Sequence, residues 1–265
     1  MTSFTEDGFL SSEIDDRVTW FRSTYPEWFN LVSSVNRFAW QLQYSLSVKT
    51  DDAQSLVCGT LYVRALSNYQ GAVLLIQRGM SSQARILLRC LLESVFSLVA
   101  VSKHKELAND FIKADEIQRM KMLNKVERWR GENLRQVAAD AQTKQTKEDL
   151  KRVIEEIGAK NIHVEEMAKK AELLDWYLTA YAVFSGAVHS SVRDLEHELA
   201  LDSSRNIVSL KNQPSYEETP ELLLAAIEAM LQTLIAVGAV LTVDTSEFVE
   251  SHYEQLRKLK NSIAS

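Results

Sequence analysis

Polar side chains recur at every third or fourth position along the otherwise apolar segment 81–103. They are Ser82, Arg85, Arg89, Glu93 and Ser97. In a helix, residues four positions apart lie one turn apart, so these side chains form one slowly winding stripe. Two guanidinium groups on one stripe could hold an anion through forked hydrogen bonds. The stripe predicts a ligand-binding cleft, although a core helix with one wet, ion-paired face would have the same pattern.

A second series of polar side chains follows at four-residue spacing in segment 177–197. Its members are Tyr177, Tyr181, Ser185, His189, Arg193 and His197. These groups share a face if the segment is one continuous helix. Histidine exchanges protons near neutral pH, so we predict His189 as the acid–base residue, assisted by Ser185 and Tyr181. Arg193 with His197 is the alternative catalytic pair. A structural histidine bonded to a neighbouring side chain is the competing interpretation.

Basic residues concentrate in one stretch of an otherwise acidic chain. The chain has 30 Lys and Arg against 36 Asp and Glu, which gives a net charge of −6. Residues 119–152, by contrast, contain ten basic and five acidic side chains, a balance of +5. Such a patch could contact nucleic acid or an acidic partner, with Arg119 as a further ligand-binding candidate. A solvated helix face has the same composition, so both interpretations stay open.

The sequence lacks the common motifs for phosphate, dinucleotide and zinc binding, and it lacks a nucleophile-elbow serine. His104, His163 and His252 stand without metal-ligand spacing. Cys58 and Cys90 lie in apolar helical patterns, which is typical of core thiols. We therefore predict no metal, no cofactor and no disulfide.

The scarcity of proline and glycine indicates which elements position these side chains. The 265 residues include 3 Pro and 8 Gly, and none of the prolines lies between residues 27 and 213. Sheet proteins need turn residues roughly every 8–12 positions, so we predict an all-α, multi-helix bundle. We expect one helical domain, 1–265, with its core at about 13–105 and 172–260. The charge-rich segment 106–171 is expected to form a polar helical-hairpin insertion.

Apolar periodicity and helix-capping residues give the expected elements. Pro26 begins a helix, and Gly79 ends another. The expected helices cover 27–48, 51–78, 81–103, 105–142 with a break near Gly131, 147–157, 172–190 and 220–243, with a short final helix after Asp244. Residues 202–219 are expected to form a loop.

The segment 222–243 is long and apolar enough to cross a bilayer. It contains Glu228 and Gln232 and lacks flanking basic residues, which favours a buried core helix over a membrane span. The N-terminal residues lack signal-peptide features, so we predict a cytoplasmic protein. An apolar C-terminal helix could also pair two copies of the chain, and homodimerisation is therefore expected.

Two motifs far apart in the chain resemble an uncharacterised family of all-helical bacterial domains. The first, after Gly79, is Ala84-Arg85-Ile86-Leu87-Leu88-Arg89-Cys90-Leu91-Leu92-Glu93. The second places Tyr181, Ser185 and His189 at four-residue spacing. The resemblance covers about residues 55–200. It implies a helical fold and one shared site formed by Arg85, Arg89, Glu93, Tyr181, Ser185 and His189, but no particular activity.

The chain is more loosely similar to HEPN-type helical ribonucleases of toxin–antitoxin and antiphage systems. Those enzymes carry an arginine, four to six intervening residues and a histidine, and two protomers combine their motifs. The nearest match, Arg193 to His197, has three intervening residues. This resemblance implies metal-independent RNA cleavage, RNA as a partner and a homodimer.

These patterns and resemblances support three hypotheses for the function of the protein. The first is a helical binding or effector protein of a bacterial defence or toxin–antitoxin-like system, whose polar cleft binds an anionic ligand or a protein partner. The second is a HEPN-like, metal-independent ribonuclease. The third is a membrane-associated helical protein.

Overall fold

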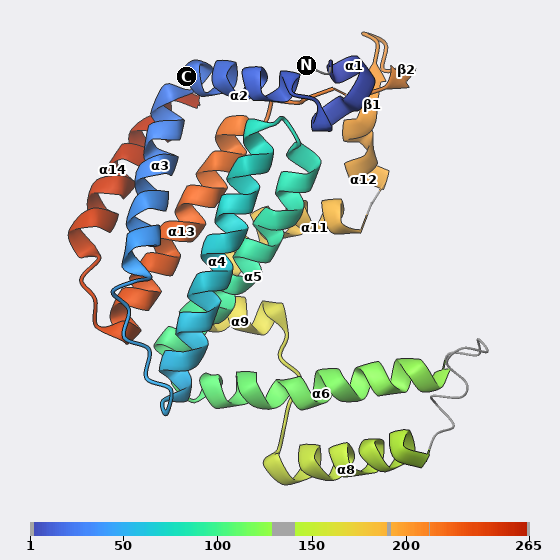
Figure 1. Cartoon of the computed structure of the whole chain (residues 1–265), viewed down its shortest axis with the longest axis vertical. Helices are drawn as coiled ribbons and strands as arrows, with labels where there is room; N and C mark the ends of the chain where they lie inside the picture. The colour runs from blue at the N-terminus through green and yellow to red at the C-terminus, as the bar shows by residue number, and fades with distance from the viewer. Residues whose placement is uncertain (1–2, 129–140, 190–191, 212, 264–265) are drawn as a thin grey trace.

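Long helices running side by side make up most of the molecule (Figure 1). The computed structural model describes residues 3–128, 141–189, 192–211 and 213–263. The bundle consists of α3 (Pro26–Leu42), α4 (Ala53–Gln77), α5 (Ser81–Lys103), α13 (Thr219–Leu241) and α14 (Ser246–Ile263). The prediction of an all-α, multi-helix fold is confirmed.

The helix α5 lies at the centre of the bundle and packs against α4 and α13. Its buried side chains include Leu88, Leu91 and Phe96. On α4, the hydroxyls of the buried Tyr62 and Tyr69 donate to the carbonyl oxygens of Ala39 and Val32, at 2.6 and 2.9 Å. These two bonds join α4 to α3 and satisfy polar groups that would be costly to bury unpaired.

Proline and glycine mark a helix start and a helix connection as predicted, whereas one predicted helix end differs. Pro26 is the first residue of α3, as predicted. Gly79, between α4 and α5, has φ +69°, and a Cβ there would lie 2.6 Å from the Cβ of Pro214. Glycine is therefore required at this turn. The helix α3 ends at Leu42 rather than near Val48, because the following loop folds back so that Val48 lies against Gly59.

Short elements surround the long helices. At the N-terminus these are α1 (Phe4–Asp7), η1 (Gly8–Leu10) and α2 (Glu13–Thr24). Beside α5 lie α9 (Val164–Lys170), α10 (Leu174–Trp176), the π-helical turn η2 (Tyr177–Tyr181), α11 (Ala182–Val188), α12 (Val192–Leu195) and η3 (Glu196–Glu198). The helix expected over 172–190 corresponds to α10, η2 and α11, which follow one another from Leu174 to Val188. It does not extend to His197, so the condition for one shared face is not met.

A small antiparallel hairpin replaces part of the predicted loop at 202–219. The strands β1 (Leu199–Leu201) and β2 (Ile207–Leu210) pair with Leu199 opposite Leu210. The loop prediction was therefore wrong for residues 207–210. The Asp202 carboxylate accepts the backbone N–H groups of Ser204 and Asn206, at 2.9 and 2.8 Å. The polar residues that indicated a loop thus form the turn of the hairpin.

Helices α6 (Leu107–Arg128) and α8 (Ala141–Ile157) pack against each other and extend away from the bundle (Figure 1). The predicted break near Gly131 lies outside the described residues. The helix α8 begins at Ala141, before the predicted start at Lys147. The helical hairpin therefore has the expected position, whereas the assignment of the whole chain to one domain stays a prediction.

The apolar helix α13 packs against α3, α4 and α5. By length and composition alone it could cross a membrane, but more than half of its most apolar window is buried inside the bundle. Leu223, Ile227 and Met230 are fully buried. The side chains that suggested a homodimer surface therefore contribute to the core. Cytoplasmic location, membrane association and homodimerisation all stay predictions.

Candidate functional site

Arg85 is the most deeply buried charged side chain of the predicted site, at 3% exposure. Its Nη1 donates to Glu218 Oε2 at 2.6 Å, and its Nη2 lies 3.2 Å from Asp194 Oδ1. Nη2 also donates to Ser82 Oγ at 3.3 Å. Arg85 Nε, however, is buried without a hydrogen-bond partner among the described residues. We call Arg85, Ser82, Asp194 and Glu218 the Arg85 cluster.

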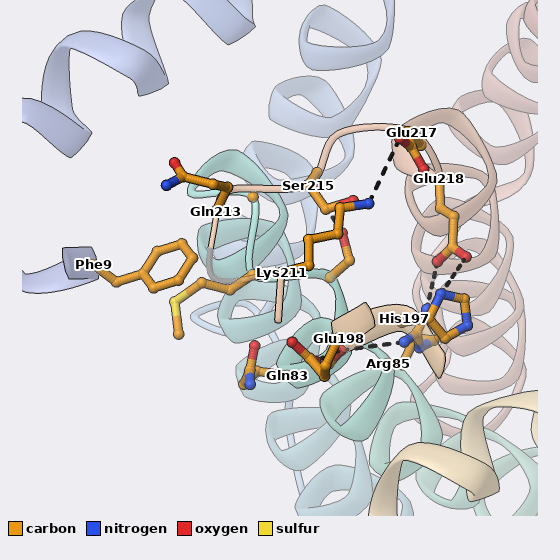
Figure 2. A pocket seen from close by; sticks show the side chains of 14 residues that line it. Phe9, Gln83, Arg85, His197, Glu198, Lys211, Gln213, Ser215, Glu217 and Glu218 are labelled. Atoms are coloured by element: carbon orange, nitrogen blue, oxygen red, sulfur yellow. Dashed lines mark hydrogen bonds and ion pairs between the residues drawn. The ribbon is translucent and has the colours of Figure 1, made fainter. Parts of the chain in front are cut away.

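A cavity of about 280 Å³ opens beside the Arg85 cluster, at the start of α5 (Figure 2). Its walls come from η1, the first turn of α5, η3 and the segment that leads into α13. The polar and charged side chains that line it include Ser82, Gln83, Arg85, His197, Glu198, Lys211, Glu217 and Glu218. We call this cavity the α5 pocket.

The first turn of α5 brings backbone donors to the pocket. The residue before the helix is Met80, and the helix has no side-chain cap. The hydroxyls of Ser81 and Ser82 instead donate to the Ser215 carbonyl and to Glu198 Oε1, at 2.9 and 2.8 Å. Uncapped N–H groups and the positive end of the helix dipole favour an oxygen acceptor at this position.

His197, the alternative catalytic histidine, lines the α5 pocket. Its Nδ1 lies 3.6 Å from Glu218 Oε1, so one carboxylate contacts both His197 and Arg85 (Figure 2). At 3.6 Å the carboxylate can attract the imidazole, but it forms no hydrogen bond that would fix the orientation of the ring. This arrangement is compatible with acid–base chemistry.

Arg89 lies one turn further along α5 and forms a separate cluster. Its Nε donates to Ser185 Oγ and its Nη2 donates to the Tyr181 hydroxyl, both at 3.0 Å. The same Nη2 lies 3.0 Å from Glu93 Oε1, which also accepts the Tyr181 hydroxyl at 2.8 Å. These residues, the Arg89 cluster, bring together four of the six residues that the family resemblance implied.

Burial and the Glu93 carboxylate raise the pKa of Tyr181 to about 12. The phenol therefore stays protonated and donates at neutral pH. The ring of Tyr181 stacks on Tyr177, with centroids 5.0 Å apart, and the Arg89 guanidinium lies 5.1 Å from its centroid. Tyr181 ends the π-helical turn η2, a type of irregularity that is frequent at functional sites.

The sequence predicted that the polar stripe on α5 faces one cleft. In the structure the stripe passes from one pocket to another. Ser82 and Arg85 line the α5 pocket, whereas Glu93 and Ser97 line a second groove of about 550 Å³, which α6 also borders. Arg89 lies between the two. Both guanidinium groups already contact carboxylates of the chain itself, which lowers their capacity to hold a free anion.

The other predicted residues lie apart from these two clusters. His189 is exposed just after α11, and no hydrogen bond joins it to the described part of the chain. Arg193 is exposed on α12. Arg119, on α6, pairs with Glu116 of the same helix at 3.0 Å. A single face from Tyr177 to His197 required one continuous helix, and it does not form because α11 ends at Val188.

The remaining histidine and cysteine side chains do not form a second polar site within the described residues. His252 is buried between the Ser34 hydroxyl and the Phe248 carbonyl, each 2.7 Å away, and burial lowers its pKa. Burial raises the pKa of the Cys58 thiol to about 12, so it is a poor nucleophile. No group of three or more metal-ligating side chains gathers in this part of the chain.

Sequence reasoning missed the carboxylates that contact Arg85. Glu218 and Asp194 come from segments more than a hundred residues away. A buried arginine needs an acidic partner, so the apolar surroundings of Arg85 were a signal that some carboxylate would lie there. With 36 acidic residues available, the spacing could not identify which one.

The similarity of the chain to known proteins is confined to a family without an assigned activity. A model of a family of unknown function, DUF5677, matches residues 55–207, which is more than half of the chain. The chain belongs to this family. The match extends from α4 into β2 and includes the Arg89 cluster, in agreement with the resemblance drawn from the two motifs. No curated protein and no solved structure matches the chain significantly.

Proposed function

We propose that this DUF5677 protein is a helical binding protein that holds a small polar ligand in the α5 pocket. The observation that carries the proposal is the buried Arg85 beside a partly open cavity of about 280 Å³. Its Nε has no partner among the described residues, although unsatisfied buried donors are rare in folded proteins. Because this nitrogen is inaccessible to water, a ligand would bind the other polar groups that line the pocket, among them Glu218, which Arg85 holds in place.

The charges around the pocket favour a ligand that also carries an ammonium group. Three glutamates, Glu198, Glu217 and Glu218, line it against only Arg85 and Lys211. Glu218 and Asp194 already neutralise Arg85. The uncapped start of α5 favours an oxygen acceptor. A small molecule with an amine and a hydroxyl or carboxylate oxygen fits this pattern better than the anion expected from the sequence.

Thermal unfolding in the presence of small probes tests this proposal. Free amino acids and ethanolamine should raise the unfolding temperature, because a ligand that binds only the folded state stabilises it, whereas inorganic phosphate should not. Glu217→Gln should abolish the shift, since Glu217 lines the pocket but is largely exposed and dispensable for folding. Glu250→Gln, an exposed change on α14, is the matched control and should leave the shift unchanged. Stabilisation by phosphate alone, or by no probe, would contradict the proposal.

A second candidate function is metal-independent RNA cleavage with His197 as the acid–base residue. It is supported by the position of His197 in the α5 pocket, with Nδ1 against Glu218. Purified protein should then cleave RNA in the presence of a chelator, and His197→Ala should remove the activity while His189→Ala retains it. Intact RNA in the wild-type reaction would exclude this candidate. A defence or toxin–antitoxin setting stays a prediction.

A further inference from the structure

The exposed face of α4 has the composition of a buried helix. Residues 53–77 contain one charged residue, Arg64. Helices on a protein surface ordinarily carry charged residues on the solvent side, and helices that are apolar all round are ordinarily covered. Yet α4 leaves Val63 and Leu74 about half exposed, at 51% and 52%, and Leu56 at 40%. This helix therefore has a face that the described residues of the chain do not cover.

The exposed residues of α4 follow the spacing of a helix-pairing surface. Leu56, Thr60, Val63, Ser67, Gln70 and Leu74 alternate at four- and three-residue steps, which is the repeat by which one helix packs along another. We call these six residues the α4 seam. Within the described chain, each is at least partly exposed.

Two hollows beside the α4 seam would accept the side chains of a second helix. One, of about 500 Å³, lies between α4 and α3 and is lined by Trp40, Val73 and Leu74. The other, of about 700 Å³, lies beside Val48, Gly59 and Val63. A ridge of side chains on another helix can enter such hollows. Binding to a membrane surface would instead favour a continuous convex apolar face.

The charges around the α4 seam identify the partner's chemistry. Arg22 and Arg37 line the first hollow and Arg64 lines the second, while neither hollow is lined by an acidic residue. Arg64 also borders the groove beside α6, which Glu93 and Asp115 line. No carboxylate forms an ion pair with these three arginines within the described residues. Basic residues beside a seam of three apolar and three uncharged polar residues are complementary to a partly apolar helix face flanked by Asp or Glu.

We propose that the α4 seam binds an amphipathic helix with acidic flanks on a partner protein. A second copy of this chain is a poorer fit. Arg64 lies near the middle of the seam, so two-fold pairing through α4 would bring the arginines of both copies together, and like charges facing each other oppose binding. The proposal is independent of the α5 pocket, since the two share no lining residue.

Two synthetic helical peptides test the proposal. Both carry the same leucine stripe at alternating three- and four-residue spacing, one with glutamates at the flanking positions and the other with lysines. Fluorescence anisotropy should show the glutamate peptide binding to the full chain at least roughly tenfold more tightly, with an affinity that falls as salt rises. Combined Arg37→Glu and Arg64→Glu substitution should reverse the preference between the peptides.

A pair of variants distinguishes loss of binding at the α4 seam from the general effect of adding a charge to the surface. Val63→Asp should abolish peptide binding, whereas Val183→Asp, which changes a somewhat more exposed valine on α11 (66% against 51%), should leave it intact. Circular dichroism should confirm that both variants fold. Equal binding of the two peptides, or binding that survives Val63→Asp, would overturn the proposal. So would a wild-type dimer that Val63→Asp converts to a monomer, or binding to anionic lipid vesicles without binding to either peptide.

Discussion

Arg85 and Arg89 lie one turn apart on α5 and carry the same guanidinium group, yet they contact different segments of the chain. Arg85 is buried and contacts two carboxylates, from α12 and from the residue before α13. Arg89 is more exposed and contacts hydroxyls of η2 and α11, together with Glu93 of its own helix. Identical residues on one stripe therefore hold different segments against the bundle.

The surroundings of an arginine, rather than its position in the sequence pattern, therefore decide how much it contributes to folding stability. A buried guanidinium with two carboxylates is costly to break, because each remaining charge would be left without a partner. A guanidinium that mainly contacts hydroxyls leaves neutral groups behind, and these can bond to water. We therefore expect the Arg85 cluster to dominate stability and the Arg89 cluster to adjust the position of α11.

The largest expected effect is that of Arg85→Ala. It should lower the free energy of unfolding by about 3 kcal/mol, at the lower end of the range for a broken buried ion pair because Glu218 is partly exposed. Urea denaturation followed by circular dichroism measures this loss. Arg257→Ala, at an exposed position of α14, is the control and should change stability by less than about 0.5 kcal/mol. Equal effects of the two substitutions would refute the distinction.

A smaller effect is expected for Tyr181→Phe. The substitution keeps the ring that stacks on Tyr177 but removes the hydroxyl that joins Arg89 to Glu93. The free energy of unfolding should fall by about 1–2 kcal/mol, since the hydrogen bonds of the hydroxyl to Arg89 and to Glu93 are both lost. Tyr44→Phe, at an exposed ring, serves as the comparison in the same urea titration. A loss as large as that of Arg85→Ala would reverse the ranking of the clusters.

The smallest expected effect is on the alkaline pH dependence of stability. Burial and the Glu93 carboxylate raise the pKa of Tyr181 from its ordinary value of 10.0 to about 12, so between these values the folded state retains a proton that the unfolded state releases. Its contribution to stability is complete below pH 10 and declines as the pH rises towards 12. At pH 11 the decline should be at most about 1 kcal/mol, because water screens the partly exposed Glu93.

Unfolding measured between pH 9 and pH 11, at intervals of about one pH unit, provides the test. Tyr181→Phe should remove part of the alkaline decline seen in the wild type, and Tyr44→Phe should leave it unchanged. Identical pH profiles for the wild type and Tyr181→Phe would show that this hydroxyl does not contribute.

Much of the fold followed from local sequence. Pro26 starts α3 and Gly79 separates α4 from α5, because each residue has a backbone preference that acts within one turn. The hairpin at 199–210 did not follow. Its polar turn resembled a loop, and pairing of β1 with β2 depends on partners that the chain reaches only after folding back.

The site was predicted in part. Four residues implied by the family resemblance, Arg89, Glu93, Tyr181 and Ser185, meet in one cluster, whereas His189 lies outside it. Periodicity placed Arg85 and Arg89 on one stripe correctly. It could not indicate that the stripe passes from the α5 pocket to a second groove, since that depends on which elements cover each turn of α5.

Most of the helices and the polar stripe on α5 could be predicted from the sequence, because helical periodicity and the lack of proline act over a few residues. The contacts of Glu218 and Asp194 with Arg85, the position of His197 in the pocket, and the exposure of Val63 and Leu74 on α4 became visible in the folded chain. These contacts join positions far apart in the chain. Burial and ion pairing depend on which segments meet in space, and local spacing does not specify those meetings.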